Sequence, residues 1–472
     1  MQNLKSAALT VSLLALGTGA LAGGSQTTPP PTTNAARQPV GEPFTMRVVT
    51  TGLQMPWELT AGPDGQLWVT ERLGKQIVRV NPTTGQKSVA VTIPGALAGG
   101  QHQGLLGMAL HPDLLKGQGR DWVYVAYTYG PEAAPKKKIV RYTFNAASGR
   151  LTAPTLVIGN LPAGNDHNAG RLKVGPDGKL YFTMGDLGHN QFANYAKPIT
   201  SQVLPTAAEI AARNWVNYTG KILRINLDGS IPGDNPSIGG VVSHVYTVGH
   251  RNPQGLDFGS NGVLYSSEQG PNSDDEINVL RGGGNYGWPN VVGYQDNQSY
   301  VYGNWSAAPN VAGLTWEPYR IPASVPTSRE TEFSAPNLTD ALMSFWVVPN
   351  SHDFTDTPIE GTNLYRPTPA LSSLEAYGKD GIPGWKNSLL VTSLKYGAVY
   401  RVPIMPSGLN TRGEAIKVLP TNNRYRDTAV SADGRTIYVI TDSGGQMLGQ
   451  QGQRVTEMAN PGAILAFTYT GK

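Results

Sequence analysis

The sequence predicts an all-β protein, more specifically a six-bladed β-propeller of four-stranded antiparallel blades. Three observations lead to this fold class: a composition rich in turn residues, a repeated turn-and-strand phrase, and a recurring spacing of that phrase. The 472 residues include 57 glycines and 36 prolines, whereas charged residues make up only 15%. Because both Gly and Pro interrupt helices, this balance favours many short strands that are joined by turns.

The repeated phrase consists of an apolar pair, a turn of the Pro-Asp-Gly type and an alternating strand. The turn supplies the residues that tight hairpins need, and the alternation is typical of a half-buried strand. A second strand with apolar-basic alternation follows each phrase. The phrase occurs as LTAGPDGQLWVTER (59–72), MALHPDLLKGQGRDWVYVAYTY (108–129), LKVGPDGKLYFTMGD (172–186), LDFGSNGVLYSSEQG (256–270) and VSADGRTIYVITDS (430–443).

The spacing between phrases is roughly 50 to 80 residues, a period that indicates radially arranged four-stranded sheets. The alternatives are a pair of β-sandwiches or an irregular β-helix, but uneven insertions on an even repeat favour the propeller. Its loops would gather residues from distant parts of the chain around one mouth of a central channel. Six blades fit, at about 46–98, 99–160, 161–240, 241–295, 340–412 and 413–472, with an insertion at about 296–340 between blades four and five.

The N-terminal residues 1–22 have the pattern of a secretory signal peptide. Lys5 provides the positive start, residues 7–16 the apolar run, and residues 20–22 a cleavage site after Ala22. The alternative is an anchor or tail, but the apolar run is too short to span a bilayer. We therefore expect a periplasmic or secreted protein that does not span the membrane. Residues 23–43 are predicted to be a flexible linker and residues 44–472 the propeller domain.

The composition also excludes several kinds of site. The chain has no cysteine, which excludes disulfides, thiolate metal sites and thiol nucleophiles. A metal must therefore bind oxygen atoms or some of the seven histidines, so calcium is favoured over zinc. The net charge of +4 gives no reason to invoke nucleic acid, although a local basic patch for an acidic ligand stays open.

The segment from Tyr246 to Trp288 carries most of the polar signals. It combines Arg251 and Asn252 with a Gly-Pro turn, a run of three acids at 274–276 and a Gly-rich turn. A core strand needs none of these residue types. Turns rich in oxygen ligands next to a fixed guanidinium indicate a calcium-assisted site for an anionic ligand.

A second signal joins His167 to Asp186, which follows nineteen residues later at the end of the next strand. Neighbouring strands of one blade would place the two side chains together. An Asp that accepts a proton from one imidazole nitrogen fixes the tautomer and raises the basicity of the other nitrogen. Such a pair suits the abstraction of a hydroxyl proton, although a His beside an Asp is more often a structural pair.

Several of these motifs resemble the soluble quinoprotein sugar dehydrogenases, which carry pyrroloquinoline quinone (PQQ) and calcium on a six-bladed propeller. The motifs are D-H-x-x-G-R-L at 166–172, the following G-D-x-G, G-H-R-N-P-Q-G-L at 249–256 and N-N-R-Y-R-D at 422–427. The resemblance covers nearly everything from Pro56 to Tyr469 but is poor at 297–365.

The resemblance implies roles for individual residues. His167 would be the general base on a sugar hydroxyl and Asp186 its orienter, while Asp166 could bind a neighbouring hydroxyl. Arg251 would stabilise the negative charge that develops on the quinone. The cofactor would be held by Asn252, Lys395, Arg424, Arg426 and Thr368, because PQQ has three carboxylates that need cationic partners. The two arginines at i and i+2 share one face of a strand.

The resemblance also implies two calcium sites. The carbonyls of Gly270 and Pro271 would hold the calcium that contacts PQQ, and this ion would polarise the quinone carbonyl. Glu276, Tyr286 and Asp296 look like a second, structural site near a dimer interface, and a homodimer is left open.

Two departures from the family pattern concern the substrate. No aromatic residue aligns where glucose-oxidising members place one over the cofactor, so Arg366 or Trp346 could occupy that place. A substrate-contacting Gln precedes G-L-L-G in the family, and this chain offers Gln101, His102 or Gln103, of which we favour Gln103. These departures affect sugar specificity and leave the redox site intact.

The sequence therefore predicts an enzyme that oxidises the anomeric hydroxyl of an aldose to a lactone. The chain contains no C-x-x-C-H haem-attachment motif, so electrons would pass to an external acceptor. One alternative is a calcium-dependent lactonase or related hydrolase on a propeller, which the cationic residues 251, 395, 424 and 426 fit poorly. The other is a non-catalytic binding propeller, which explains the fold but not the clustered motifs.

Overall fold

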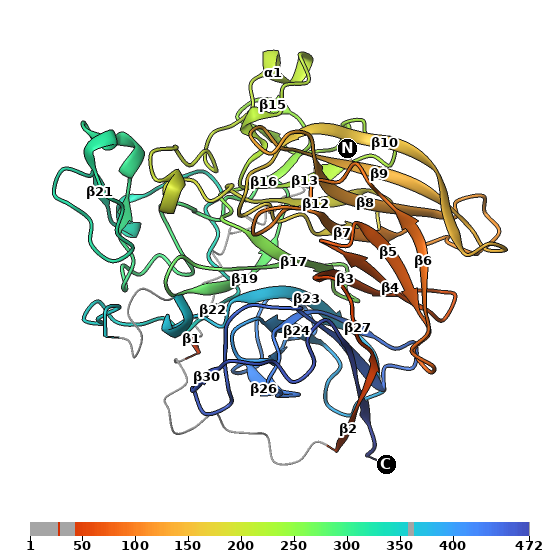
Figure 1. Ribbon diagram of the computed structural model, residues 1–472. Coiled ribbons are helices and arrows are strands. Elements are labelled where there is room, and N and C mark those ends of the chain that lie inside the picture. Colours follow the sequence, from red (N-terminus) through yellow and green to blue (C-terminus); the bar gives the residue numbers. More distant parts are fainter. Residues whose placement is uncertain (1–26, 29–42, 357–362, 472) are drawn as a thin grey trace, which may run out of the picture.

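The computed structural model describes residues 27–28, 43–356 and 363–471, and its strands are arranged as blades around a central axis (Figure 1). Among the described residues, six large sheets each contain four antiparallel strands, and a short parallel strand joins the edge of one of them, which confirms the predicted six-bladed propeller. The single α-helix of the described residues, α1 (Ala207–Ala211), is one of the loop excursions. None of the helices described is long and apolar enough to cross a membrane.

The strands of each blade follow one another outward from the axis. Blades one to three contain β3 (Pro56–Ala61), β4 (Leu67–Glu71), β5 (Gln76–Val80) and β6 (Lys87–Thr92); β7 (Leu105–Leu110), β8 (Trp122–Tyr129), β9 (Lys136–Asn145) and β10 (Arg150–Pro162); and β11 (Leu172–Val174), β12 (Leu180–Met184), β13 (Lys221–Ile225) and β16 (Val245–Val248). Blades four to six contain β17 (Pro253–Phe258), β18 (Leu264–Glu268), β19 (Asp275–Leu280) and β22 (Met343–Phe345); β23 (Leu371–Tyr377), β24 (Ser388–Ser393), β25 (Ala398–Pro403) and β26 (Ile416–Val418); and β27 (Tyr425–Val430), β28 (Thr436–Thr441), β31 (Ile464–Tyr469) and β2 (Phe44–Thr50).

The repeated phrase of the sequence forms the hairpin between the first and second strands of a blade. In blades one, three and six its turn glycines, Gly65, Gly178 and Gly434, have φ of +69°, +70° and +75°. A side chain is strained at such angles, which is why the turn requires glycine. The phrase therefore marks the innermost strands, whose loops surround the channel mouth.

Three strands lie in other blades than predicted, because the phrase does not show to which blade an outer strand belongs. Strand β2 was expected in blade one, but it pairs with β31 and completes blade six, so the two ends of the domain close the ring (Figure 1). Strand β16 was expected in blade four, yet it pairs with β13 of blade three. Strand β22 belongs to blade four through its pairing with β19.

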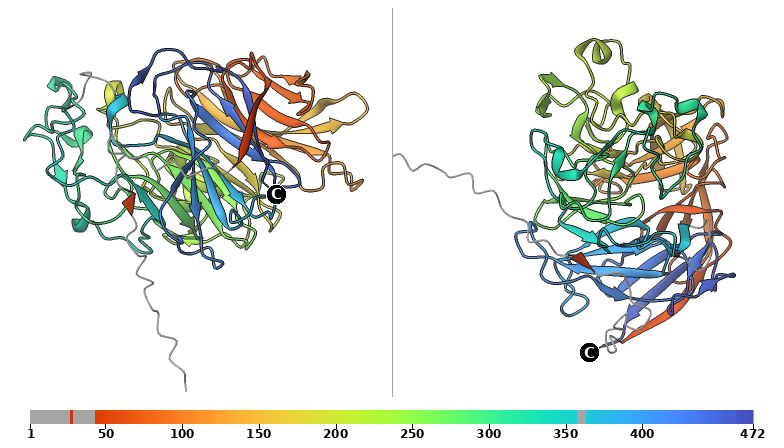
Figure 2. Two further views of the ribbon diagram at one scale, coloured as in Figure 1. Left: turned by 90° about the horizontal axis from the view of Figure 1, so that it is seen from below. Right: turned by 90° about the vertical axis from the view of Figure 1, so that its left-hand side faces the viewer.

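The insertion consequently lies within blade four, between β19 and β22, and not between blades four and five. It projects from the side of the propeller (Figure 2). It contains the short pair β20 (Tyr302–Gly303) and β21 (Thr327–Ser328) and a small apolar cluster around Trp305. Similar short pairs, β14 (Ser237–Ile238) with β15 (Val241–Val242) and β29 (Met447–Leu448) with β30 (Arg454–Val455), extend blades three and six.

The predicted signal peptide at 1–22, with its cleavage site after Ala22, lies outside the described residues. Of the predicted linker at 23–43, the structure describes residues 27–28 and 43. Strand β1 (Thr27–Thr28) pairs in parallel with β22 at the outer edge of blade four.

Apolar clusters fill each of the six interfaces between neighbouring blades. One cluster, for example, joins Leu59 and Val69 of blade one to Ala429 and Ile440 of blade six. Five equivalent clusters join the other neighbours. Because flat sheets pack face to face in a closed ring, the core is divided among the interfaces and the axis stays available for polar groups.

One arginine crosses this axis and connects five blades. Arg171, at the start of blade three, pairs with Glu58 of blade one at 2.6 Å and with Asp427 of blade six at 2.8 Å. Its guanidinium also donates to the carbonyls of Gln254 and Ser372, in blades four and five. A buried charge needs this full set of partners, and the set fixes the inner strands relative to one another beneath the channel mouth.

Candidate active site

A cavity of about 680 Å³ opens at the channel mouth, where loops from blades two to six meet. The loops that line it enter or leave the innermost strands, as the phrase predicted. Nine of the expected site residues contribute to its wall: Asp166, His167, Arg251, Gly270, Pro271, Thr368, Lys395, Arg424 and Arg426. Asp186 and Asn252 lie directly behind this wall.

The predicted base and its partner are brought together. The Nδ1 atom of His167 lies 2.7 Å from Oδ1 of Asp186, and both side chains are buried. Asp186 accepts further hydrogen bonds from the Gly188 amide at 2.9 Å and from Nε1 of Trp288 at 2.9 Å. All the contacts of this carboxylate are with N–H donors, so it acts as an acceptor and His167 carries its proton on Nδ1.

With the proton on Nδ1, the other ring nitrogen, Nε2, is available as an acceptor, and His167 lines the cavity. Its Nε2 atom lies 3.3 Å from Nε2 of Gln191, whose Oε1 accepts a hydrogen bond from Arg251 at 3.2 Å. Gln191 thus bridges the base and the guanidinium. Sequence reasoning missed this residue, because a glutamine seven residues after the end of β12 gives no signal until the loop is folded.

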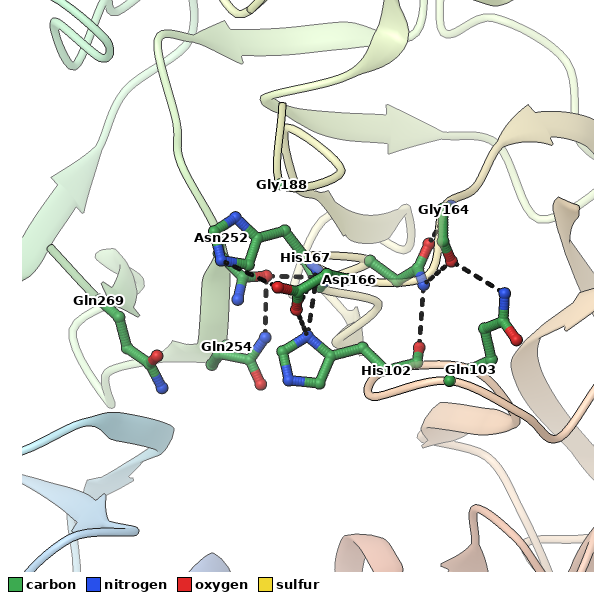
Figure 3. A network of polar contacts seen from close by, with 12 residues as sticks. His102, Gln103, Gly164, Asp166, His167, Gly188, Asn252, Gln254 and Gln269 are labelled. Atoms are coloured by element: carbon green, nitrogen blue, oxygen red, sulfur yellow. Dashed lines mark hydrogen bonds and ion pairs between the residues drawn. The ribbon is translucent and has the colours of Figure 1, made fainter. Parts of the chain in front are cut away.

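Asp166 is held beside His167 by a second imidazole (Figure 3). Its Oδ1 atom lies 2.9 Å from Nδ1 of His102, and its Oδ2 atom 3.9 Å from Nε2 of His167. Burial alone would raise the pKa of Asp166, but the His167 and His102 rings outweigh burial and hold this pKa below its ordinary value. Asp166 is therefore anionic near neutral pH, and it can accept a hydrogen bond inside the cavity.

The substrate glutamine that we expected is not at the cavity surface. Gln103 is only 1% exposed, and its amide donates to the Gly164 carbonyl at 3.2 Å (Figure 3). Gln101 and His102 line the cavity instead. Gln101 and His102 lie in a turn, whose side-chain directions follow no simple alternation, so the sequence could not decide among the three.

The Arg251–Asn252 pair is held from behind by one carboxylate that sequence reasoning also missed. Glu268 accepts hydrogen bonds from the Arg251 and Asn252 amides at 2.7 and 3.2 Å, and its other oxygen lies 2.8 Å from Nδ1 of His250. The guanidinium of Arg251 donates to the Gln269 carbonyl at 3.1 Å and lies 5.4 Å from the ring centre of Trp288.

The opposite wall is basic. Both Arg424 and Arg426 contact the carboxylate of Asp442, and Arg426 does so through two hydrogen bonds of 2.9 Å. Lys395 donates to Oγ1 of Thr368 at 3.0 Å and to the Arg366 carbonyl at 2.7 Å. Burial lowers the pKa of Lys395 to about 7, although Asp275 opposes this effect.

Three buried donors around this cavity lack partners in the described structure. They are Nε of Arg251, Nη1 of Arg426 and Nδ2 of Asn252. An unpaired buried donor is costly, and native proteins rarely leave several of them in one place. With Lys395 and Arg424 nearby, these donors fit a flat molecule with several carboxylate or carbonyl oxygens.

The turn at Gly270 and Pro271 offers oxygen atoms, but one of them is occupied. The Gly270 amide donates to Asp275 at 3.1 Å, and a Cβ atom on Gly270 would lie 1.8 Å from the Ser273 carbonyl oxygen, so the turn requires glycine. The Pro271 carbonyl accepts a hydrogen bond of 2.9 Å from Arg366. Neutral carbonyls beside a carboxylate suit a hard cation, provided that the guanidinium moves.

Two of the three residues expected at a second metal site, Glu276 and Tyr286, make hydrogen bonds to separate backbone groups. Glu276 accepts from the Gly293 amide at 2.7 Å, Tyr286 donates to the Val279 carbonyl at 2.6 Å, and the second metal site stays a prediction. Burial raises the pKa of Glu330 to about 8, and the nearby Asp296 adds to this effect. Across the described ranges, no three His, Asp or Glu side chains form a group that could hold a metal ion.

Of the two residues considered for the place of the family's aromatic residue, Arg366 lines the cavity and Trp346 does not. Trp346 is buried, with its ring centre 5.0 Å from that of Tyr396. The two alternatives were open because neither could be aligned through the long insertion.

We predict that Asp186→Asn lowers kcat by about 10²-fold. Both carboxylate oxygens accept from N–H groups, so an amide must direct its own N–H at either His167 or Trp288. Either choice disturbs the tautomer or the position of the base. Steady-state kinetics with a sugar and a dye acceptor would measure the effect; a kcat within twofold of the original would contradict this role.

Known proteins resemble this chain over nearly its whole length. The model of the family described as Glucose / Sorbosone dehydrogenase matches residues 53–338 and 350–449. Quinoprotein glucose dehydrogenase B of Acinetobacter calcoaceticus is 43% identical over 444 residues, which cover 91% of this chain and 92% of that protein. An aldose sugar dehydrogenase of Escherichia coli is 25% identical over 405 residues, covering 84% of this chain and 90% of that one.

A solved structure agrees with these sequence matches. The PQQ-bound form of aldose sugar dehydrogenase from Streptomyces coelicolor has a TM-score of 0.61 and 25% identity, and the match covers 91% of this chain and 99% of that chain. The resemblance first seen in short motifs is thus confirmed over the whole domain. The chain therefore belongs to the glucose/sorbosone dehydrogenase family, and it is an oxidoreductase of the sugar dehydrogenase class.

Proposed function

We propose that this protein oxidises the anomeric hydroxyl of an aldose to the lactone, with PQQ and calcium as cofactors. The observation that carries the proposal is the convergence, in one cavity, of a base with an orienting carboxylate and a wall of unpaired buried donors. The names of the similar proteins, a quinoprotein glucose dehydrogenase and a PQQ-bound aldose sugar dehydrogenase, support the same reaction.

His167 would take the proton of the anomeric hydroxyl on Nε2. Its Nδ1 proton stays on the hydrogen bond to Asp186, whose negative charge stabilises the imidazolium that forms. Asp166 would accept a hydrogen bond from a neighbouring sugar hydroxyl and so orient the ring. Gln191 lies between the base and Arg251, where it can contact the same hydroxyl.

The cationic and amide groups would hold the cofactor. Arg424, Arg426 and Lys395 would pair with its carboxylates, while Asn252 and Thr368 supply hydrogen bonds. Arg251 lies across the cavity, where its guanidinium would stabilise negative charge on a quinone oxygen. When bound, PQQ supplies a two-electron acceptor for the hydride that leaves the sugar carbon, and an external acceptor then removes the electrons.

The proposal gives calcium two sites, one beside the cofactor and one structural. The Gly270 and Pro271 carbonyls would bind the ion beside the cofactor, where a hard cation polarises a carbonyl as a Lewis acid. Glu276, Tyr286 and Asp296 are proposed for a structural ion.

We also propose export to the periplasm or the medium after cleavage behind Ala22, which N-terminal sequencing of the mature protein would test.

Reconstitution tests the function directly. The chelator-treated protein is given calcium, PQQ or both, and dye reduction is followed with a panel of aldoses. We expect sugar-dependent reduction only with both additions. Tight PQQ binding without reduction on any sugar would contradict the substrate class, and an absence of PQQ binding would overturn the quinoprotein assignment.

The buried amine of Lys395 predicts a pH dependence of cofactor binding. Its pKa of about 7 means that the ammonium form, which pairs with a carboxylate, is lost as the pH rises above neutrality. The association constant for PQQ should therefore fall above pH 7, by up to about tenfold per pH unit. Titrations of the chelated protein at several pH values would measure this slope. Lys395→Met should flatten it, and an equally steep slope in that variant would contradict the assignment.

A further inference from the structure

The position of Arg366 carries an inference about how the metal enters. This residue stands at the cavity wall and is 9% exposed. Its Nη1 atom donates to the Pro271 carbonyl at 2.9 Å, and its Nε atom donates to the Tyr319 hydroxyl at 2.9 Å. The guanidinium also lies 5.2 Å from the ring centre of Tyr319. A planar cation is thus fixed on an oxygen that was expected to bind calcium.

The support for this guanidinium comes from two separate parts of the chain. Tyr319 belongs to the insertion of blade four, and its ring stacks in parallel on that of Phe354 at a centroid distance of 5.8 Å. The backbone carbonyl of Arg366 is itself held by Lys395 at 2.7 Å. Hydrogen bonds therefore fix both the guanidinium and the backbone carbonyl of Arg366 at the cavity wall.

Two cations cannot share the Pro271 carbonyl at close range. Calcium takes its oxygen ligands at about 2.3–2.6 Å, which would place the ion within contact range of the guanidinium. The surrounding charge adds to the conflict, because Arg251 and Lys395 also lie near Arg366, and Asp275 is the nearby carboxylate. In the protein without cofactor, the Arg366 guanidinium already occupies the position beside the Pro271 carbonyl that calcium would take.

We propose that Arg366 is a built-in competitor of calcium at the Pro271 carbonyl and sets the calcium affinity of the cofactor-free protein. The proposal rests on the proposed calcium role of Gly270 and Pro271. Binding of the ion requires the guanidinium to leave Pro271. The anionic cofactor gives it a new partner in the same cavity, so calcium and cofactor should bind more tightly together than singly.

Calcium titration of the chelator-treated full chain without PQQ tests the competition. The variant Arg366→Met keeps most of the apolar stem and removes the guanidinium. The matched control is Arg320→Met, which removes the same charge from an exposed position next to Tyr319 and leaves Pro271 untouched. Isothermal titration calorimetry gives the affinities, and thermal melting in chelator shows that all three proteins are folded. A calcium site elsewhere would titrate alike in all three proteins, so the difference reports on Pro271.

We expect Arg366→Met to bind calcium at least tenfold more tightly than the original protein, and Arg320→Met to stay within twofold. Equal affinities in all three proteins, or weaker binding by Arg366→Met, would overturn the competition while leaving calcium dependence intact. An absence of calcium binding in every protein, with and without PQQ, would overturn both this inference and the calcium part of the proposed function.

Discussion

Replacement of His167 by Asn is expected to lower kcat by about 10²–10⁴-fold, the range that a positioned general base contributes. An asparagine amide can still donate to Asp186 from nearly the place of Nδ1, but it has no atom at the place of Nε2. The loop geometry is therefore preserved while the proton acceptor is lost. The affinity for PQQ should stay within about twofold, because His167 is not among the residues proposed to hold the cofactor.

Rapid mixing of the loaded variant with sugar separates the chemical step from cofactor exchange. The matched control is His244→Asn, which alters a buried histidine bonded to Tyr218 at 3.0 Å, away from the cavity. This control should lose stability and keep its kcat. If His167→Asn turns over at a normal rate, the base must be another group, and Asp166 would be the next one to test.

Replacement of Arg424, which directly precedes β27, and of Arg426, which lies on β27, is expected to weaken PQQ binding by at least about 10²-fold. In Arg424→Ala with Arg426→Ala, two charge-assisted contacts with carboxylates are lost, each worth about 1.5–3 kcal/mol. The variant also removes both arginines that form ion pairs with the buried Asp442, and a buried carboxylate with less cationic compensation repels an anionic cofactor.

A matched pair elsewhere in the propeller separates affinity from stability. Arg79 pairs with Asp64 at 2.6 Å and lies 5.2 Å from the ring centre of Trp68, just as Arg426 pairs with Asp442 and lies 4.7 Å from that of Trp57. Arg79→Ala should lower the melting temperature and keep PQQ binding. An unchanged dissociation constant in the double variant would assign residues 424 and 426 to the support of Asp442 alone.

Local signals explain why so much of the fold was predictable. A Pro-Asp-Gly turn requires glycine at a positive φ, and the strand after it must alternate to bury one face, so each phrase marks an inner hairpin. The outer strands carry no such signal. Strand β2 can join blade six only because the ends of the domain meet in space, and β22 joins blade four after an insertion of many residues.

The residues of the candidate site likewise divide into those that the sequence predicted and those that it missed. Residues within motifs, such as His167 with Asp186 and Arg424 with Arg426, were found because they lie in short motifs that the family shares, at or beside the ends of inner strands. Gln191 and Glu268 were missed, since Gln191 acts through Arg251 at the entry of the next blade and Glu268 through the loop that enters its own blade, and neither contact leaves a pattern in the sequence. Gln103 was expected at the surface and is buried, because the pattern of a loop does not show which side chains face a cavity.

The sequence by itself determined the fold class, the family and most of the side chains around the cavity. Each of these depends on short-range chemistry: turn residues, alternation and motifs a few residues long. Only the tertiary structure decided which strand closes the ring, that Arg171 connects five blades, and that Arg366 contacts the Pro271 carbonyl. Those contacts join segments that lie up to several hundred residues apart, and their geometry exists only when all six blades are packed around one axis.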